Sequence, residues 1–391
     1  MKLNKHSVIG VVGTGTMGTG IAQVAATAGH SVLVYDKNND ALLRARHSLI
    51  KIFNRLIEKG KYSQGEVDSI LHRIQWVDGL GRFESCDLVI EAIVEDIEVK
   101  KQFFHQLKSV THDDCILATN TSSLSVASIA SVLKFKHRMI GIHFFNPAAL
   151  MPLVEIVPAL TTGDEVVKQV SELIKSWGKT TVVAKDTPGF IVNRIARPFY
   201  GEAFKMYEEG VADPATIDWA MREIGGFKMG PFELTDLIGQ DINYTVSETV
   251  WRELYYDPRY KPSITQKRLM EAGLFGQKTG KGFYDYADGA VKPEPKKDKE
   301  LGKQIVNRIL AMLINEAADA AFLNIASKKD IDTAMTKGVN YPKGLLKWAN
   351  EIGLEVVLER LEKLYKEYND DRYRPSVLLK RNVQEKTDFY Y

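Results

Sequence analysis

Short runs of apolar residues alternate with longer amphipathic segments in the first half of the chain. The first run, residues 7–12, is short, apolar and rich in β-branched residues, which is typical of a parallel strand buried on both faces. Helical patterns separate the runs. The alternation predicts an α/β fold with a doubly wound sheet of the Rossmann type. We expect its strands at residues 7–12, 31–35, 88–92, 116–119, 139–143, 153–157 and 180–184.

After residue 186 the strand patterns stop and long amphipathic stretches begin. Residues 191–209 and 217–223 have apolar positions at helical spacing, which predicts an all-α region. Residues 287–300 are polar and interrupted by prolines, as linkers are. We therefore expect a sheet domain at residues 1–186, a helical domain at 187–286, a linker at 287–300 and a second helical domain at 301–391.

The two helical segments repeat each other. Ile191-Val-Asn-Arg-Ile195 recurs as Ile305-Val-Asn-Arg-Ile309, at an offset of 114 residues (305 − 191 = 114). Several matches in one register are not expected by chance, so we interpret the helical region as a tandem duplication. The further matches, of which the last has an offset of 113, are Glu202-Ala203 with Glu316-Ala317, Asp218-Trp-Ala-Met221 with Asp332-Thr-Ala-Met335, and Lys261-Pro-Ser263 with Arg374-Pro-Ser376.

A glycine-rich turn follows the first predicted strand. Gly13, Gly15 and Gly18 have the spacing Gly-x-Gly-x-x-Gly, and Asp36 ends the next strand, 23 residues after the first glycine (36 − 13 = 23). In this context the three glycines give a tight turn, room for a pyrophosphate and close packing of helix on strand. Asp36 would bind ribose hydroxyls and repel a 2′-phosphate. The unit predicts binding of NAD, and Lys37 is a counter-signal to the preference for NAD over NADP. The alternative is a glycine-rich turn of another doubly wound fold.

One histidine stands at a position suited to catalysis. His143 ends a predicted strand, and Glu155 follows twelve residues later on the next one (155 − 143 = 12). Ligands of doubly wound sheets lie at the carboxyl ends of the strands. A carboxylate beside the imidazole would fix its tautomer and make it more basic, which suits a general acid/base that moves the proton of an alcohol. The alternative is a core histidine satisfied by the backbone, with a glutamate that faces solvent.

Composition and charge restrict the classes of partner. The 391 residues include 52 Lys+Arg and 50 Asp+Glu, a net charge of +2, which argues against a nucleic-acid backbone or an anionic membrane as the main partner. The two cysteines, Cys86 and Cys115, form no disulfide framework or metal spacing. The start has no room for a signal peptide, and no apolar run is long enough for a membrane helix. We expect a cytoplasmic, soluble protein without a metal site.

Further motifs stand in one order between residues 13 and 284. The set is Gly13 to Gly18, Glu91-Ala-Ile-Val-Glu95-Asp96, Asn120-Thr-Ser122, His143-Phe-Phe-Asn146-Pro, Thr187-Pro-Gly-Phe-Ile-Val-Asn193-Arg and Lys278-Thr-Gly-Lys-Gly-Phe-Tyr. Together they resemble the L-3-hydroxyacyl-CoA dehydrogenase family, including its 3-hydroxybutyryl-CoA members. Asp96 departs from the resemblance, because many relatives have Asn there, and it adds a negative charge near the expected nicotinamide side.

The resemblance implies roles for individual residues. His143 would be the catalytic base in oxidation and the acid in reduction, and Glu155 would orient it. Ser122 and Asn193 would contact substrate oxygens, although a helix N-cap and a helix-face amide are the respective alternatives. Lys59, directly after a basic helix at residues 41–58, lies near a coenzyme A contact of the family; the alternative is that the basic run is a solvated helix face. The positions that correspond to NAD contacts are Gly13, Gly15, Thr16, Met17, Gly18, Asp36, Glu95, Lys100, Asn146 and Lys278.

The sequence therefore predicts NAD-dependent oxidation of an (S)-3-hydroxyacyl-CoA to a 3-oxoacyl-CoA, and the reverse. The alternatives are a dehydrogenase of a free hydroxy acid, such as a sugar acid, and a non-catalytic protein of the crystallin kind. The second helical copy has Asn307 where the first has Asn193, but no nucleotide-binding domain precedes it. We expect one active site per chain and a structural Asn307. The chain would be a monomer, with the two copies packed as an internal pseudo-dimer, or a homodimer.

Overall fold

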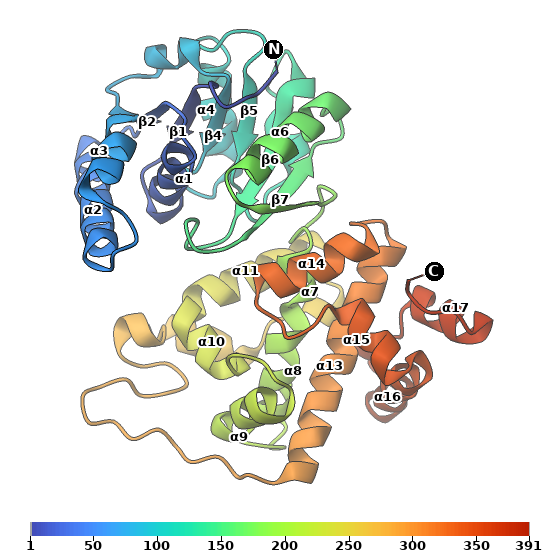
Figure 1. Cartoon of the computed structure of the whole chain (residues 1–391). Helices are drawn as coiled ribbons and strands as arrows, with labels where there is room; N and C mark the ends of the chain where they lie inside the picture. Colours follow the sequence, from blue (N-terminus) through green and yellow to red (C-terminus); the bar gives the residue numbers. More distant parts are fainter. Residues whose placement is uncertain (1, 391) are drawn as a thin grey trace. The chain divides into compact units, whose positions relative to one another are not determined.

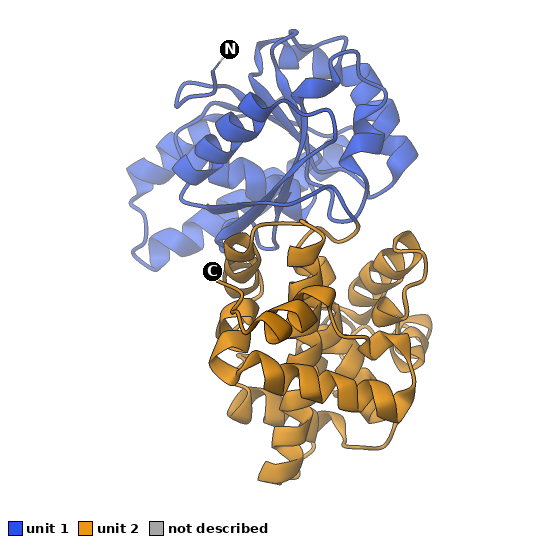
Figure 2. Cartoon of the chain, turned by 90° about the vertical axis from the view of Figure 1, so that its right-hand side faces the viewer, with its two compact units in different colours: residues 1–187 blue, residues 188–391 orange. Residues whose placement is uncertain are grey.

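A computed structural model describes residues 2–390. The chain divides into two compact units, Met1–Thr187 and Pro188–Tyr391 (Figure 2). Both helical copies lie together in the second unit, and the predicted linker contains no regular helix or strand before α13 begins at Lys299. Within residues 2–390, no helix combines the length and the apolar character that a membrane span requires.

The first unit is built on an eight-stranded sheet in the order β3-β2-β1-β4-β5-β6-β7-β8 (Figure 1). All neighbouring strands are parallel except β6 and β7. The predicted fold class is confirmed. The strand that the hydrophobic pattern did not predict is β3, a three-residue edge strand with one buried residue. The strands are β1 (Ile9–Val12), β2 (Val32–Tyr35), β3 (Ile74–Trp76), β4 (Leu88–Glu91), β5 (Ile116–Thr119), β6 (Met139–Phe144), β7 (Leu153–Pro158) and β8 (Thr180–Val183).

Helices cover both faces of this sheet and bury a continuous apolar core (Figure 1). Side chains at the N-termini of several helices cap the first backbone N–H groups. Asn38 accepts hydrogen bonds from the first backbone N–H groups of α2, and Ser63 and Glu66 form a capping box at α3. Asp96 caps α4 in the same way, so its carboxylate binds the helix terminus that Asn could also bind. The helices are α1 (Thr16–Thr27), α2 (Asn39–Glu58), α3 (Gln64–His72), α4 (Ile97–Leu107), α5 (Val126–Ala130) and α6 (Asp164–Ser176).

The second unit is helical, and its elements repeat. The starts of α14 and α15 follow those of α9 and α10 by 114 residues (328 − 214 and 345 − 231), and that of α17 follows α12 by 113 (377 − 264). Helix α13 lies against α8, its counterpart (Figure 1). The helices are α7 (Val192–Ile195), α8 (Arg197–Glu208), α9 (Pro214–Trp219), α10 (Pro231–Ile238), α11 (Gln240–Glu253), α12 (Ile264–Glu271), α13 (Lys299–Phe322), α14 (Lys328–Gly338), α15 (Leu345–Ile352), α16 (Leu354–Tyr368) and α17 (Val377–Glu385).

The amphipathic stretch at residues 191–209 forms two helices. The helical spacing continues through the stretch, but α7 ends at Ile195 and α8 begins at Arg197. Pro198 stands in the first turn of α8, where a proline fits and where it cannot continue a preceding helix. The second copy has no proline there, and α13 runs through the equivalent position without a break. The two copies therefore differ at Asn193, which lies in the short helix before the break.

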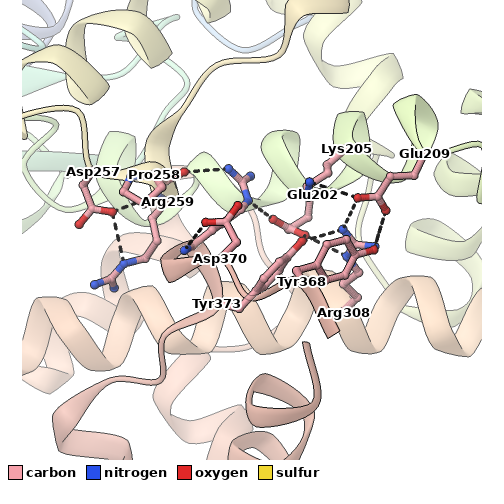
Figure 3. A network of polar contacts seen from close by, with 11 residues as sticks. Glu202, Lys205, Glu209, Asp257, Pro258, Arg259, Arg308, Tyr368, Asp370 and Tyr373 are labelled. Atoms are coloured by element: carbon pink, nitrogen blue, oxygen red, sulfur yellow. Dashed lines mark hydrogen bonds and ion pairs between the residues drawn. The ribbon is translucent and has the colours of Figure 1, made fainter. Parts of the chain in front are cut away.

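A buried glutamate joins the first copy to the second (Figure 3). Glu202, on α8, accepts hydrogen bonds from Arg308 Nε (3.0 Å), Arg372 Nε (2.5 Å) and the Tyr373 hydroxyl (3.1 Å), all from the second copy. Burial alone would raise the pKa of Glu202, but the charges of Arg372 and Arg308 outweigh burial and hold it below its usual value. The carboxylate is thus an ionised, fully buried partner of two guanidinium groups.

The same contact occurs in reverse from the second copy to the first. Glu316, the counterpart of Glu202, accepts hydrogen bonds from Arg194 Nε (2.9 Å) and from the Tyr260 hydroxyl, and lies 3.5 Å from Arg259 Nη1. These three residues are the counterparts of Arg308, Tyr373 and Arg372 at offsets of 114, 113 and 113 (308 − 194, 373 − 260, 372 − 259). Each copy gives the other one carboxylate and receives two arginines and a tyrosine. This reciprocity is the pattern of a two-fold dimer interface within one chain.

Candidate active site

Strands β6 and β7 place His143 beside Glu155. The two strands pair antiparallel with these residues directly opposite each other, and His143 Nδ1 lies 2.6 Å from a Glu155 carboxylate oxygen. Glu155 is 0% exposed and His143 5%. A buried carboxylate at this distance fixes the orientation of the ring and favours a proton on Nδ1. The two residues therefore lie side by side as the sequence predicted.

The loop that carries Ser122 is organised by Glu95. Glu95 Oε1 accepts hydrogen bonds from Thr121 Oγ1 (2.6 Å) and from the backbone N–H of Ser122 (2.9 Å). The hydroxyls of Ser122 and Ser123 lie 3.4 and 3.2 Å from the same oxygen. One carboxylate oxygen is thus the common acceptor for the hydrogen-bond donors of residues 121–123. Glu95, which we expected only as a cofactor contact, also sets the position of Ser122.

Ser122 is not the N-cap of the helix that follows it. That helix, α5, is capped by Ser125, which accepts a hydrogen bond from the backbone N–H of Ser128. Asp186 also binds this helix terminus through the backbone N–H groups of Val126 (3.0 Å) and Ala127 (2.7 Å). The cap interpretation of Ser122 is therefore wrong. Sequence reasoning missed Asp186, because its partners lie about 60 residues away in the chain.

Lys100 is buried and contacts the carboxylate of Glu95 from the interior of the unit. It is 1% exposed, and its Nζ lies 2.5 Å from Glu91 Oε1 and 3.3 Å from Glu95 Oε2. Burial alone would raise the pKa of Glu95, but the charge of Lys100 and hydrogen bonds from Thr121 and Ser122 outweigh it, so the pKa lies below its usual value. Lys100 was expected as an NAD contact, yet the structure places its ammonium group between two carboxylates. Its effect on the site therefore passes through Glu95.

Glu91 was missed as a site residue by the sequence analysis. It ends β4 and is fully buried. Besides binding Lys100, it accepts hydrogen bonds from Thr119 Oγ1 (2.7 Å) and from the backbone N–H of Ile93 (2.7 Å). The available signal was a charged residue within an apolar strand, which is costly unless it is paired.

The glycine-rich turn has the geometry that a dinucleotide requires. Gly13 has φ +95°, and a Cβ there would lie 2.5 Å from the carbonyl oxygen of Ala92. A Cβ on Gly18 would lie 1.8 Å from the carbonyl oxygen of Gly13, so only glycine lets α1 start this close to β1. Gly15 has open space beside it and stands at the N-cap of α1 without a side-chain cap. The first N–H groups of α1 therefore face a position suited to phosphates.

The remaining cofactor positions of the first unit occupy the same sheet edge or its surroundings. Thr16 and Met17 are the first residues of α1. Asp36 follows β2, and one of its carboxylate oxygens accepts hydrogen bonds from the backbone N–H and the hydroxyl of Thr14, both at 2.8 Å. Asn146 is exposed in the loop after β6. Lys59, the expected coenzyme A contact, is exposed at the C-terminus of α2.

Asn193 and Lys278 belong to the second unit. Asn193 lies in α7, and its backbone carbonyl accepts a hydrogen bond from Arg197 Nε (2.8 Å). Lys278 Nζ lies 2.7 Å from an Asp241 carboxylate oxygen and over the ring of Phe275. Both are therefore held by neighbours within their own unit.

Comparisons with known proteins agree with this geometry. Residues 8–187 match the model of the 3-hydroxyacyl-CoA dehydrogenase NAD-binding domain, and residues 189–286 and 304–387 each match that of the family's C-terminal domain. The Escherichia coli protein named 3-hydroxyadipyl-CoA dehydrogenase is 38% identical over 98% of both chains. The Deinococcus radiodurans protein named probable 3-hydroxybutyryl-CoA dehydrogenase is 40% identical over 71% of this chain and 99% of its own.

A solved structure extends the likeness to the whole fold. The crystal structure titled 3-hydroxybutyryl-CoA dehydrogenase from Escherichia coli K12 has a TM-score of 0.92 and 37% identity, and the match covers 98% of this chain and 99% of that one. The corresponding enzyme from Ralstonia eutropha has a TM-score of 0.70 over 72% of this chain. The chain belongs to the 3-hydroxyacyl-CoA dehydrogenase family and is an NAD-dependent oxidoreductase.

Proposed function

We propose that the protein interconverts (S)-3-hydroxyacyl-CoA and 3-oxoacyl-CoA with His143 as the general acid/base. The observation that carries this proposal is the buried contact between His143 Nδ1 and Glu155. Strand β6 is parallel to β5, which continues through β4 to β1, so His143 lies towards the same edge of the sheet as the Gly13 turn. Ligands of doubly wound sheets bind at this edge.

The proton and the hydride leave the substrate separately. In oxidation, His143 Nε2 takes the proton of the 3-hydroxyl, because Nδ1 is committed to Glu155. NAD, when bound, accepts the hydride from the 3-carbon. The imidazolium that forms is stabilised by the buried carboxylate of Glu155. In the reverse direction His143 returns the proton to the 3-oxo oxygen.

Two further side chains hold the reacting group in this proposal. The Ser122 hydroxyl, in the turn fixed by Glu95, binds the oxygen on the 3-carbon, and the Asn193 amide binds a substrate oxygen near it. The Gly13 turn, the start of α1 and Asp36 bind NAD. Asp36 favours NAD over NADP, since a 2′-phosphate would meet its carboxylate. Tighter binding of NADPH than of NADH in a titration would contradict this assignment.

The proposal is tested by the oxidation of NADH with acetoacetyl-CoA. We expect turnover with the thioester, little with free acetoacetate, and a kcat about 10²- to 10⁴-fold lower in His143→Ala. Turnover of the free acid alone would favour the hydroxy-acid alternative. A wild-type protein that turns over no CoA ester would contradict the proposed function.

A dicarboxylic acyl chain is the second candidate substrate. The relative named 3-hydroxyadipyl-CoA dehydrogenase matches 98% of this chain, so it shares both helical copies, whereas the Deinococcus relative named for 3-hydroxybutyryl-CoA corresponds to 71% of it. Comparison of kcat/KM for 3-hydroxyadipyl-CoA and 3-hydroxybutyryl-CoA distinguishes the two. A higher value for the dicarboxylic thioester would support this candidate, and a higher value for the C4 thioester would contradict it.

We propose that the second helical copy replaces the partner subunit of a dimer. The support is the reciprocal pair of contacts around Glu202 and Glu316. A chain truncated after Ala287 would expose the surface on which the second copy packs. Light scattering should then show self-association of the truncated chain. A truncated chain that stays soluble in the oligomeric state of the full chain would contradict the proposal.

A further inference from the structure

The first helical copy has a polar core. Among its buried polar or charged side chains, five that are each at most 8% exposed lie near one another: Arg197, Gln240, Asn243, Ser247 and Gln266. They come from α8, α11 and α12. Gln266 Nε2 donates to Asn243 Oδ1 (3.1 Å) and to Gln240 Oε1 (2.9 Å), and Arg197 Nη1 donates to Ser247 Oγ (2.9 Å). The backbone carbonyl of Asn243 joins the two groups, because it accepts hydrogen bonds from Ser247 Oγ (2.9 Å) and Arg197 Nη1 (3.5 Å), and together they form a polar network inside a helical bundle.

The second copy has an apolar core at the same positions. The first four residues have counterparts at an offset of 114 and Gln266 has one at 113 (311 − 197, 354 − 240, 357 − 243, 361 − 247, 379 − 266). These counterparts are Ala311, Leu354, Val357, Leu361 and Leu379, each at most 4% exposed. Equivalent helices therefore pack around a polar network in the first copy and around aliphatic side chains in the second.

This contrast shows that the scaffold does not need the network in order to fold. Buried polar groups add little net stability when they are paired, and a buried charge without a counter-charge is costly. Among residues 2–390, the groups that hold the Arg197 guanidinium are neutral: the carbonyls of Asn193 and Asn243, the hydroxyl of Ser247 and the ring of Tyr200. Burial lowers the pKa of Arg197 accordingly. The presence of Arg197 in the first copy therefore calls for a functional reason.

The network runs from Asn193 to the backbone turn that follows Lys278. At one end, Arg197 Nε donates to the carbonyl of Asn193 across the break between α7 and α8. At the other, Gln240 Nε2 donates to Asp236 Oδ1 (2.7 Å), and Asp236 accepts the backbone N–H groups of Phe283 and Tyr284 in the turn after Lys278. Asn307, in the second copy, lies inside the continuous helix α13, where the helix itself fixes the backbone.

We propose that Arg197 is a positioning residue that holds Asn193 in its working orientation, with Ser247 and Asn243 as its anchors. The inference rests on the proposed function of Asn193. The break after α7 leaves a single helical turn to carry the catalytic amide, and the guanidinium joins that turn to α11. The second copy, whose asparagine has no substrate to bind, has Ala311 at this position and an unbroken helix.

A double-mutant cycle tests this inference in the full-length chain. The variants Asn193→Ala, Arg197→Ala and the double variant are assayed with acetoacetyl-CoA and NADH. Arg197→Ala should lower kcat about ten- to hundredfold, since displacement of a catalytic group by about 1 Å has effects of this size, and should leave the KM for NADH within about twofold. In the Asn193→Ala background, Arg197→Ala should lower kcat no further.

Two controls keep the result interpretable. Asn307→Ala, the matched change in the second copy, should leave kcat unchanged. Ser247→Ala removes only an anchor of the guanidinium, so it should give a smaller loss that is also absent in the Asn193→Ala background; it replaces Arg197→Ala if that variant fails to fold. Losses that multiply independently, or an unchanged kcat in Arg197→Ala, would overturn the inference alone. A wild type without turnover would overturn the proposed function and the inference together. An Asn193→Ala variant with normal kcat would leave the proposed reaction standing but would overturn the role of Asn193, and the inference with it.

Discussion

The two helical copies share the residues that join them and differ in the residues that fill their cores. Glu202 and Glu316 each bind two arginines and a tyrosine of the other copy. By contrast, Arg197 and its polar neighbours in the first copy are replaced by aliphatic residues in the second. The shared residues maintain the fold and its internal two-fold symmetry. The polar core belongs to the first copy, which follows the nucleotide-binding domain and contains Asn193. The difference separates structural requirements from functional ones within one chain.

A second shared feature supports this reading. Asp218 accepts hydrogen bonds from backbone N–H groups in the first turn of α10 and from one tyrosine hydroxyl. Asp332 does the same at the first turn of α15. The glycines beside them are required for close approach, since a Cβ on Gly230 or on Gly344 would lie 2.3 Å from the carboxyl carbon of its aspartate. These contacts fix helix starts in both copies and belong to the scaffold.

The largest expected effect comes from the shared glutamates. Glu202→Ala and Glu316→Ala should each lower the free energy of unfolding by about 3–5 kcal/mol, because each removes the carboxylate that pairs with a buried arginine, Arg372 in the first variant and Arg194 in the second. Denaturant unfolding of the two variants measures this. The internal two-fold predicts losses of similar size, so a large loss in one variant beside none in the other would break the equivalence of the copies.

The polar core should behave in the opposite way. The triple variant Gln240→Leu, Asn243→Val and Gln266→Leu gives the first copy the side chains that the second has at these positions. We expect the free energy of unfolding to stay the same or to rise by about 1–2 kcal/mol, because apolar replacement of a complete buried polar group is often stabilising. Thermal and denaturant unfolding check this. A loss of more than about 2 kcal/mol would mean that the network serves stability.

The pH dependence of stability should depend on Glu202. In the folded chain the pKa of Glu202 lies below its usual value. Between the folded and the unfolded pKa, the folded state therefore binds fewer protons than the unfolded state. Its stabilisation is complete above the unfolded pKa of about 4.3 and is lost as the pH falls through the folded pKa. Unfolding free energies measured between pH 6 and pH 3 should therefore fall less steeply in Glu202→Gln than in the wild type. Equal slopes would contradict the prediction.

The smallest expected effect concerns one turn that the copies form with different residues. Gly226 and its counterpart Asn340 both have a left-handed backbone, with φ of +72° and +55°. Because Asn adopts this conformation more readily than Ala, Gly226→Ala should cost about 1 kcal/mol and Gly226→Asn clearly less. Melting temperatures of the two variants distinguish them. Equal losses would show that the turn is not equivalent in the two copies.

Local patterns were sufficient for most of the fold. The hydrophobic runs located seven of the eight strands, and the glycine spacing located the cofactor turn; the eighth strand, β3, was missed because it is short and mostly not buried. The repeat offset in the sequence is the offset of the helices in the structure. Periodicity and turn chemistry act over a few residues, so they can be read from the chain directly. The break after Ile195 was missed because the helical pattern continues through it.

Partners distant in sequence were not predictable in this way. The sequence placed His143 and Glu155 on consecutive strands and so predicted the pair, together with the fold class, the cofactor turn and the duplication. The antiparallel register that sets the two side chains opposite each other comes from the structure. The tertiary structure alone decided that Lys100 is buried between Glu91 and Glu95, and that Arg197 reaches Asn193 and α11. The physical reason is that the cost of burying a charge is offset only by groups that folding brings close, and their identity depends on the packing of the whole unit.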